Sequence, residues 1–276
     1  MTLAPVDFDY LRRLVKTHSA IVIDPAKAYL VENRLGPLVR QHGCVSLPDF
    51  LRLLQSQPLG PLHHEAVAAM ANKETWFFRD SAPFTALSQY VLPELLKNRP
   101  RERGLSIWSA ACSTGQEPYS IAMLLRESCP AAAPQASILA TDFCPAALER
   151  ASRAIYGQMD VNRGLPAALL TRYFIQRGLS WQLKPEIAAM VNFRRLNLAV
   201  AWPAAPPMDI IFLRNVLIYF DSETRRQVLT RIHRALRPDG FLFLGSAETP
   251  RDLDRAFEPL EAGTYLCYQP SKQAPR

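Results

Sequence analysis

The sequence LSIWSAACSTGQEPY, residues 105–119, constrains the fold of this chain more than any other stretch. It begins with an apolar run typical of a β-strand, continues through a turn of small residues from Ala110 to Gly115, and enters a helix at Gln116. Such a turn lets backbone N–H groups approach a bound molecule, and the helix start adds unpaired donors and the positive end of a dipole. The pattern predicts a strand–turn–helix unit that binds a nucleotide or a similar ligand, although packing alone can also favour small residues here.

A second strand is predicted over residues 136–143, and Asp142 stands at its end. In nucleotide-binding α/β folds, a carboxylate at this place accepts hydrogen bonds from ribose hydroxyls. The alternative is that Asp142 caps the next helix, since Pro145 follows it closely. A further apolar strand, residues 208–216, finishes in Arg214 and Asn215, at the sheet edge where such folds bind ligands.

The small-residue turn lacks the GxGxxG pattern of dinucleotide enzymes. Together with the acidic end of the second strand, this favours a nucleoside ligand without a pyrophosphate. S-adenosylmethionine meets that description, because it is an adenosine whose tail ends in an amino acid. Glu117, in the first turn of the following helix, is placed to receive the ammonium group of that tail.

The first 70 or so residues have apolar side chains at helical spacing, and they predict a small helical bundle. Ser46 is expected to cap its third helix, with Pro48 in the first turn. His63 and His64 are neighbours in the fourth helix and point about 100° apart, so we expect no metal site. We therefore expect a helical domain over residues 1–72 and an α/β domain over residues 73–276.

The stretch 72–80 places three aromatic residues between polar and charged ones. One interpretation is an apolar plug that joins two domains. The other is that Thr75 and Arg79 present a hydroxyl and a guanidinium beside rings that exclude water, and a guanidinium fork fits a carboxylate. The spacing alone does not separate these interpretations.

More than half of the net charge of +7 lies in residues 156–200, which carry 6 basic and 2 acidic side chains. This segment indicates an acidic partner, either nucleic acid or a carboxylate-rich protein, or else a solvated face. Short strands are predicted at 173–176, 181–184 and 191–198, forming a small antiparallel insert at about 157–195 whose last strand rejoins the main sheet.

Towards the end of the chain, Asp221 or Ser222 is expected to cap a helix, residues 240–245 to form a buried strand, and residues 264–268 a final strand at the sheet edge. Five scattered cysteines without CxxC spacing predict reduced thiols. No apolar run approaches about 18 residues, and residues 1–10 lack the layout of a signal peptide, so we expect a soluble cytoplasmic protein.

Five motifs occur in order along the chain: ETWFFRD, WSAACSTGQEPYSIAM, ATDF, FRRLNL and FLRNVLIYFD. Together they resemble the chemotaxis receptor glutamate methyltransferase (CheR-type) family over nearly the whole chain. The resemblance implies a helical N-terminal domain followed by a Rossmann-like class I methyltransferase sheet with a small antiparallel β insert. It implies that Arg79 and Tyr219 act on the transferred methyl group and its acceptor, and it assigns S-adenosylmethionine to Thr75, Arg79, Glu117, Asp142, Asn197, Leu198, Arg214 and Asn215.

The resemblance also implies methyl transfer to glutamate carboxylates of chemoreceptors, giving a methyl ester and S-adenosylhomocysteine, by a monomer recruited to receptor arrays. Two residues before Thr75 the family usually has Asn, whereas this chain has Lys73. A nucleic-acid methyltransferase and a non-catalytic cofactor sensor are the alternatives. The strand end at Arg214 lacks the NPPY-like signature of the former, so no nucleic acid is expected as a partner.

Overall fold

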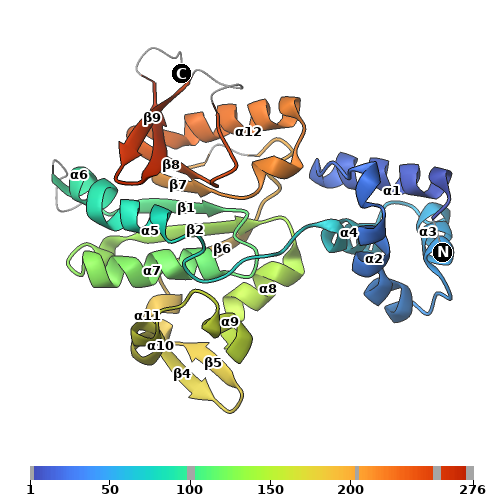
Figure 1. Cartoon of the computed structure of the whole chain (residues 1–276), viewed down its shortest axis with the longest axis horizontal. Helices are drawn as coiled ribbons and strands as arrows, with labels where there is room; N and C mark the ends of the chain where they lie inside the picture. Colours follow the sequence, from blue (N-terminus) through green and yellow to red (C-terminus); the bar gives the residue numbers. More distant parts are fainter. Residues whose placement is uncertain (1–2, 98–102, 203–204, 251–255, 272–276) are drawn as a thin grey trace. The chain divides into compact units, whose positions relative to one another are not determined.

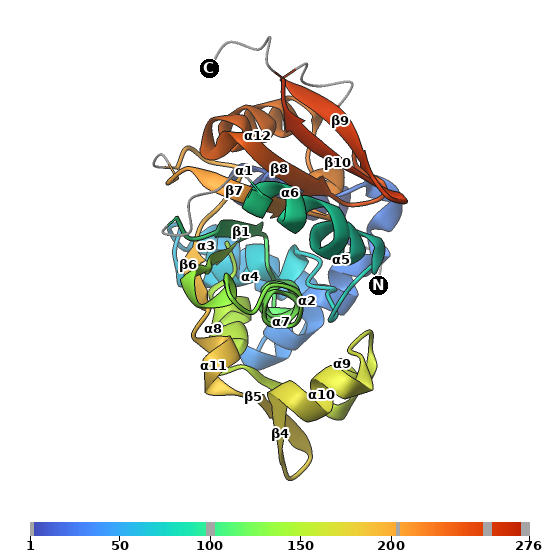
Figure 2. The same cartoon turned by 90° about the vertical axis from the view of Figure 1, so that its left-hand side faces the viewer.

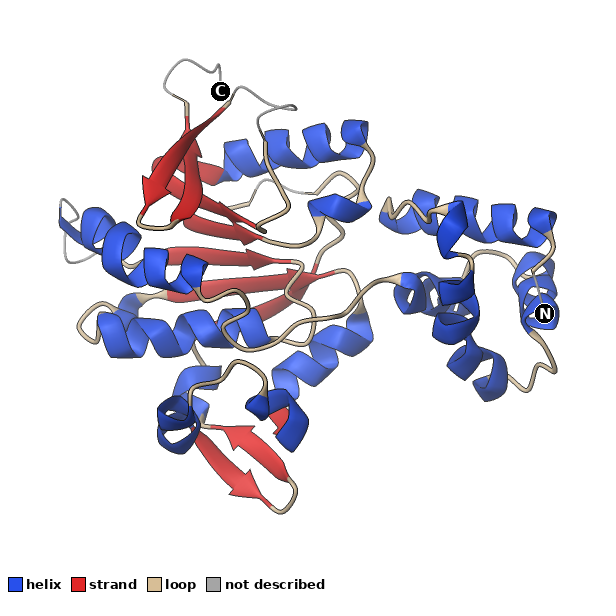
Figure 3. Cartoon of the chain, in the orientation of Figure 1, coloured by secondary structure: helices blue, strands red, loops and turns tan. Residues whose placement is uncertain are grey.

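The computed structural model describes residues 3–97, 103–202, 205–250 and 256–271. The chain forms two compact units. The helical unit comprises Met1–Asn72 together with Tyr219–Arg225, and the sheet unit comprises Lys73–Ile218 and Arg226–Arg276. Figure 1 follows the chain through both units, and Figure 3 separates their helices from their strands.

The helical unit contains α1 (Pro5–Ser19), α2 (Tyr29–Gln41), α3 (Leu47–Ser56) and α4 (Pro61–Met70). Its core is made of aliphatic and aromatic side chains spaced three or four residues apart, among them Leu11, Val15, Val31, Leu35, Phe50 and Leu54. Ser46 caps α3, because its hydroxyl accepts a hydrogen bond from the N–H of Asp49. His63 is buried, and its Nε2 lies 2.9 Å from the carbonyl oxygen of Leu54.

Among the described residues, the sheet unit is built on a mostly parallel sheet of seven strands with flanking helices (Figure 2). In spatial order the strands are β6 (Val191–Arg195), β2 (Ser137–Asp142), β1 (Ser106–Ala110), β7 (Met208–Leu213), β8 (Leu236–Leu244), β10 (Tyr265–Pro270) and β9 (Phe257–Ala262). The helices are α5 (Ala82–Ala86), a π-helix (Leu87–Val91), α6 (Leu92–Lys97), α7 (Gln116–Ser128), α8 (Pro145–Arg153) and α12 (Ser222–Ala235). The first four residues of α12 belong to the helical unit and the rest to the sheet unit.

The centre of the sheet is apolar on both faces, as expected for parallel strands covered by helices. β7 is buried along its whole length, and Phe212 stacks on Phe243 of β8 with ring centroids 4.4 Å apart. Trp108 of β1 is fully buried and donates its indole N–H to the hydroxyl of Thr141. The apolar runs that predicted these strands therefore form the core.

The final strand does not lie at the edge, so that prediction was wrong. β10 pairs antiparallel with β8 on one side and with β9 on the other, which makes β9 the edge strand. β9 has the sequence FEPLEA, and its proline and two glutamates weaken the strand pattern. Edge strands tolerate such residues because one row of their backbone groups needs no partner strand.

A second sheet of three antiparallel strands interrupts the alternation of the main sheet. Its order is β3 (Ile155–Gly157), β5 (Ser180–Leu183), β4 (Phe174–Arg177), and it is accompanied by α9 (Gln158–Asn162), α10 (Ala167–Tyr173) and α11 (Pro185–Ala188). β3 has three residues, too short for its pattern to be recognised. β6, the last of the predicted short strands, pairs parallel with β2 in the main sheet.

No helix among the described residues is both long and apolar enough to cross a membrane. Within the same residues, no group of three or more His, Cys, Asp and Glu side chains is arranged to hold a metal ion.

Candidate active site

The candidate site lies at the carboxyl ends of β1, β2 and β7. β1 pairs with β2 on one side and with β7 on the other, and all three strands are parallel. Strands β2 and β6 lie on one side of β1, and β7 and β8 lie on the other, so the strand order changes direction at β1. In open α/β sheets, ligands bind outside the carboxyl ends of the strands at such a switch point.

The small-residue turn after β1 has a strained backbone that brings it close to its neighbours. Ala111, Ser113 and Gly115 all have positive φ, and Gly115 has a φ of +92°. A Cβ atom at Gly115 would lie 2.9 Å from the Cβ of Ala151 and 3.0 Å from the Tyr156 hydroxyl oxygen. Glycine is therefore required at this position, and α7 begins immediately after it.

Asp142 is buried beside this turn and holds it in place. One carboxylate oxygen accepts a hydrogen bond from the N–H of Ser113, and the other from the N–H of Cys144, both at 2.9 Å. Burial raises the pKa of Asp142, and these N–H groups and the charge of Lys73 oppose that shift. The N-cap of α8 is Cys144 rather than Asp142. A carboxylate has about four acceptor positions, so Asp142 can still accept ribose hydroxyls.

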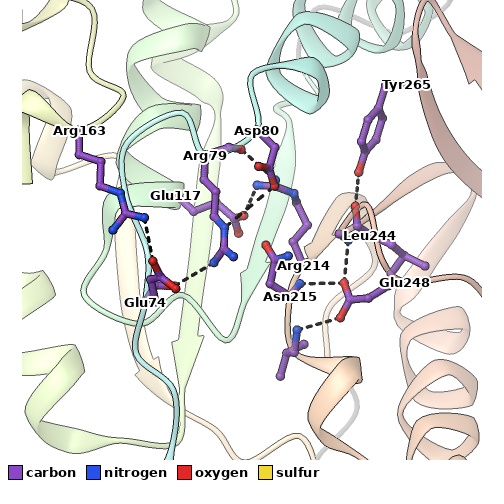
Figure 4. Close-up of polar contacts among 12 residues, drawn as sticks. Glu74, Arg79, Asp80, Glu117, Arg163, Arg214, Asn215, Leu244, Glu248 and Tyr265 are labelled. Atoms are coloured by element: carbon purple, nitrogen blue, oxygen red, sulfur yellow. Dashed lines mark hydrogen bonds and ion pairs between the residues drawn. The ribbon is translucent and has the colours of Figure 1, made fainter.

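Glu117 and Arg214 form an ion pair between the start of α7 and the end of β7, in which Arg214 is buried and Glu117 is partly buried. Glu117 Oε2 lies 3.0 Å from Arg214 Nη1, and Glu117 Oε1 accepts a hydrogen bond from the Ser109 hydroxyl at 2.8 Å. Arg214 Nη2 also donates to the carbonyl oxygen of Arg79 and to a carboxylate oxygen of Asp80 (Figure 4). Arg214 thus fixes the segment that carries Arg79 against the strand ends.

Arg79 is held by its own segment. Its Nη1 donates to the carbonyl oxygen of Glu74 at 2.9 Å, and its Cζ lies 4.4 Å from the centroid of the Trp76 ring. Its Nε is buried and has no hydrogen-bond partner, and the Asp80 carboxylate oxygen is 4.0 Å away. A partly exposed guanidinium with one buried, unsatisfied donor is suited to an anionic ligand.

The segment 73–80 also packs on the turn and on α7. The Ser113 hydroxyl donates to the carbonyl oxygen of Lys73, and the N–H of Phe78 donates to the Ser120 hydroxyl, both at 2.9 Å. Lys73 therefore contacts the turn through its backbone. Thr75 lies half-buried in the same segment.

Three other predicted residues follow β6 and β7 at the same edge of the sheet. Asn197 Oδ1 accepts a hydrogen bond from the N–H of Ala199, and Leu198 is buried. Asn215 adopts a φ of +58° directly after Arg214. The structure thus brings the residues predicted to hold the cofactor to one edge of the sheet unit.

Glu248 belongs to this site and was missed by the sequence reasoning. It is buried, and its carboxylate accepts four backbone N–H groups, those of Asn215, Val216, Leu217 and Gly245, at 2.7 to 2.8 Å. Figure 4 shows the contact with Asn215. The one available signal was an acidic residue shortly after the apolar strand β8. Three of the four donors follow a different strand, β7, so the pattern around Glu248 does not reveal its role.

Tyr219 belongs to the helical unit. Its hydroxyl oxygen accepts a hydrogen bond from Asn72 Nδ2 at 2.7 Å, and its carbonyl oxygen accepts one from the N–H of Val22 at 2.9 Å. Both partners lie in the same unit, so Tyr219 is fixed within it.

The mostly parallel sheet, the glycine-dependent turn and the buried acid at the end of β2 define a Rossmann-like nucleoside-binding domain of the class I methyltransferase type. Comparison with known proteins gives the family. The SAM-binding domain of CheR methyltransferases matches residues 73–266, and the all-alpha domain of CheR methyltransferases matches residues 6–70. The chain belongs to the CheR methyltransferase family, and its cofactor is S-adenosylmethionine.

Individual relatives are similar in sequence to this chain over almost its whole length. The chain is 38% identical to chemotaxis protein methyltransferase Cher2 of Pseudomonas putida, over 98% of this chain and 99% of that protein. It is 39% identical to chemotaxis protein methyltransferase 1 of Pseudomonas aeruginosa, with the same coverage of both chains. It is 33% identical to the chemotaxis protein methyltransferase of Escherichia coli, over 93% of this chain and 89% of that protein. The chain is thus a methyltransferase of chemotaxis proteins.

The residues present fit S-adenosylmethionine. Gly115 closes the turn where a Cβ atom would clash, and the other turn residues are small, as a nucleoside site lined largely by backbone requires. Arg79 and Arg214 each have a buried Nε without a hydrogen-bond partner. Glu117 offers acceptor oxygens to an ammonium group, and Asp142 offers them to hydroxyls.

Proposed function

We propose that this protein methylates glutamate side chains of chemoreceptors and that Arg79 orients a carboxylate for the reaction. The observation that carries the proposal is the Arg79 guanidinium, held over Trp76 with a buried donor that lacks a partner. The proposed products are a glutamate methyl ester and S-adenosylhomocysteine. The proposed partners are the glutamate-rich cytoplasmic helices of receptors, whose arrays would recruit the enzyme.

The proposed reaction needs no general base. Bound S-adenosylmethionine supplies an electrophilic methyl group on a sulfonium. The acceptor carboxylate is ionised at neutral pH, because glutamate has a pKa of about 4.3. The carboxylate oxygen forms a bond to the methyl carbon as the carbon–sulfur bond breaks, and the electron pair of that bond stays on sulfur.

The protein contributes alignment and exclusion of water, effects worth up to about 7–11 kcal/mol in favourable cases. In the proposal Arg79 orients the carboxylate of the acceptor or of the cofactor, and Tyr219 fixes the methyl group or the acceptor by a hydrogen bond. Thr75, Glu117, Asp142, Asn197, Leu198, Arg214 and Asn215 hold the cofactor.

The test is Arg79→Ala, assayed with labelled S-adenosylmethionine and receptor fragments. Volatile methanol released by alkali reports the methyl ester. We expect turnover to fall by about 100-fold or more, since misplacing a reacting group by about 1 Å costs that much. Arg153→Ala is the matched control, because Arg153 is exposed on α8 and lies outside the basic segment.

Turnover by Arg79→Ala at the control level would refute the assignment. Label that is transferred to protein but withstands alkali would refute the ester product. Transfer to RNA without transfer to receptor fragments would favour a nucleic-acid methyltransferase instead.

A further inference from the structure

Two arginines from distant parts of the sequence share one indole ring and one glutamate. The Cζ of Arg79 lies 4.4 Å from the centroid of the Trp76 ring, and the Cζ of Arg163 lies 3.8 Å from it. Arg163 Nη2 donates to Glu74 Oε1 at 2.7 Å, whereas Arg79 Nη1 donates to the carbonyl oxygen of Glu74 (Figure 4). The carboxylate of Glu74 is thus paired with Arg163, and its backbone with Arg79.

The backbone after Arg163 is pressed against the segment that carries Trp76. Gly164 has a φ of +80°, and a Cβ atom there would lie 2.1 Å from the carbonyl oxygen of Phe77 and 2.8 Å from Cδ1 of Trp76. Only glycine allows this approach. The location of Arg163 is therefore set by backbone packing, although its side chain is half exposed.

The charges make this arrangement sensitive to the loss of Arg163. The hydrogen bond from Arg163 is the largest of the causes that lower the pKa of Glu74, and the charge of Arg79 is the smallest. Glu74 is consequently ionised at neutral pH. If Arg163 were absent, the nearest guanidinium for its carboxylate would be Arg79, which already lies within hydrogen-bond distance of the Glu74 backbone.

We infer that Arg163 is a positioning residue that keeps the carboxylate of Glu74 away from Arg79, so that the Arg79 guanidinium stays available to a ligand carboxylate. The inference rests on the proposed function of Arg79 and deepens it. It gives the segment after α9, which leads into the three-stranded insert, a part in ligand binding. Without Arg163, Glu74 acts as an internal competitor of the ligand.

The test compares Arg163→Gln with Arg172→Gln in the full chain. Arg172 is the matched control, because it is an exposed arginine of the same insert that pairs with Glu127, and its loss removes the same charge. Arg163→Gln is expected to raise the KM for a receptor fragment, or the Kd for S-adenosylhomocysteine measured by calorimetry, by about tenfold, the effect of losing one charge-assisted contact. The value of kcat changes less, because saturating ligand displaces the competing carboxylate.

The double variant Glu74→Gln, Arg163→Gln separates competition from packing. It is expected to recover most of the loss, since a neutral amide competes weakly for Arg79, and Glu74→Gln alone is expected to resemble the unmodified protein. A KM and a Kd for Arg163→Gln equal to those of Arg172→Gln would overturn the inference. Failure of the double variant to improve on Arg163→Gln would overturn it as well.

The outcomes keep the two proposals apart. If Arg79→Ala retains turnover, the proposed function fails, and this inference fails with it. If Arg79→Ala is inactive while Arg163→Gln behaves like its control, only the positioning role of Arg163 is lost.

Discussion

Single residues order the site through backbone contacts as much as through side-chain chemistry. The carboxylate of Glu248 joins the ends of β7 and β8 by accepting four N–H groups, three of them consecutive in the loop that leads away from Arg214. A Cβ atom at Gly245 would lie 2.7 Å from Glu248 Oε2 and 2.8 Å from Asn215 Nδ2. The position of Asn215 thus depends on a residue that needs no contact with the ligand.

Glu248→Gln tests this dependence. An amide has one acceptor oxygen and presents N–H donors where the carboxylate had its second oxygen, so two backbone N–H groups are left without an acceptor. Leaving a buried group unsatisfied costs about 1–3 kcal/mol. For two such groups we expect the free energy of unfolding, measured in urea, to fall by about 2–6 kcal/mol and the Kd for S-adenosylhomocysteine to rise.

Glu261→Gln is the control for Glu248→Gln, because Glu261 is exposed on the edge strand β9. An unfolding midpoint for Glu248→Gln that matched the control would show that the four contacts contribute nothing to stability.

The residues that sequence reasoning placed correctly at the strand ends are those whose neighbours in the chain carry the signal. Glu117 and Asp142 follow apolar strands directly or after one small turn, so the pattern of the strand also locates the residue. Three of the four donors to Glu248 lie 31 to 33 residues away in the chain, and Arg163 lies 89 residues from Glu74, so neither set of contacts was predicted. Spacing along one segment carries no information about such partners.

At the scale of elements, helix caps could be predicted from the sequence, but the spatial order of the last strands in the sheet could not. Thr224 donates its N–H to Asp221 at 2.9 Å, so of the two predicted caps Asp221 is the one that acts. The order β8-β10-β9 depends on β9, whose proline and glutamates weaken the strand pattern in the sequence. A helix cap depends on residues within one turn of each other, whereas strand order depends on pairing between segments that are far apart in the chain.

Asp221 gives a pH-dependent prediction. The N–H of Thr224, and then Lys16 at 2.9 Å, lower the pKa of Asp221 from 3.8 to about 2. Because the folded pKa lies below the unfolded one, its contribution to stability is present above about pH 4 and is lost as the pH falls towards 2. Asp221→Ala should reduce the free energy of unfolding by about 1 kcal/mol at pH 7.

Urea titrations at pH 7 and pH 3 measure this contribution. The difference between the unmodified protein and Asp221→Ala should shrink at the lower pH. Asp221→Asn retains a capping oxygen and loses the charge, so it should lie between the two at pH 7. A difference that stayed constant with pH would contradict the assigned cap and ion pair.

At the scale of the whole molecule, the segment 219–225 groups with helices that precede it by about 150 residues or more. Val22 and Asn72 bind Tyr219, and Lys16 binds Asp221. The sequence predicted a helical bundle from the periodicity of its own residues. Periodicity does not reveal that a motif following β7 belongs to this unit, because only tertiary contacts bring the two together.

The charge of the whole chain gives the last prediction. The net charge is +7, and Arg177, Arg194 and Arg195 of the basic segment are exposed. If the acceptor is a glutamate-rich helix, as proposed, salt should screen the attraction between that helix and the basic segment. The Debye length falls from about 30 Å at 0.01 M ionic strength to about 10 Å at 0.1 M. We therefore expect the KM for a receptor fragment to rise several-fold across that range.

Calorimetry with S-adenosylhomocysteine provides the internal control, because contacts with Arg214 and Asp142 are buried and buried charges are screened much less than exposed ones. Its Kd should change little over the same range of salt. Reversing the charge of Arg194 and Arg195 together should flatten the salt dependence of KM, since both lie exposed on β6. If the KM of the unmodified protein did not change with salt, the basic segment would be only a solvated face. Receptor recognition would then have to be assigned to other residues.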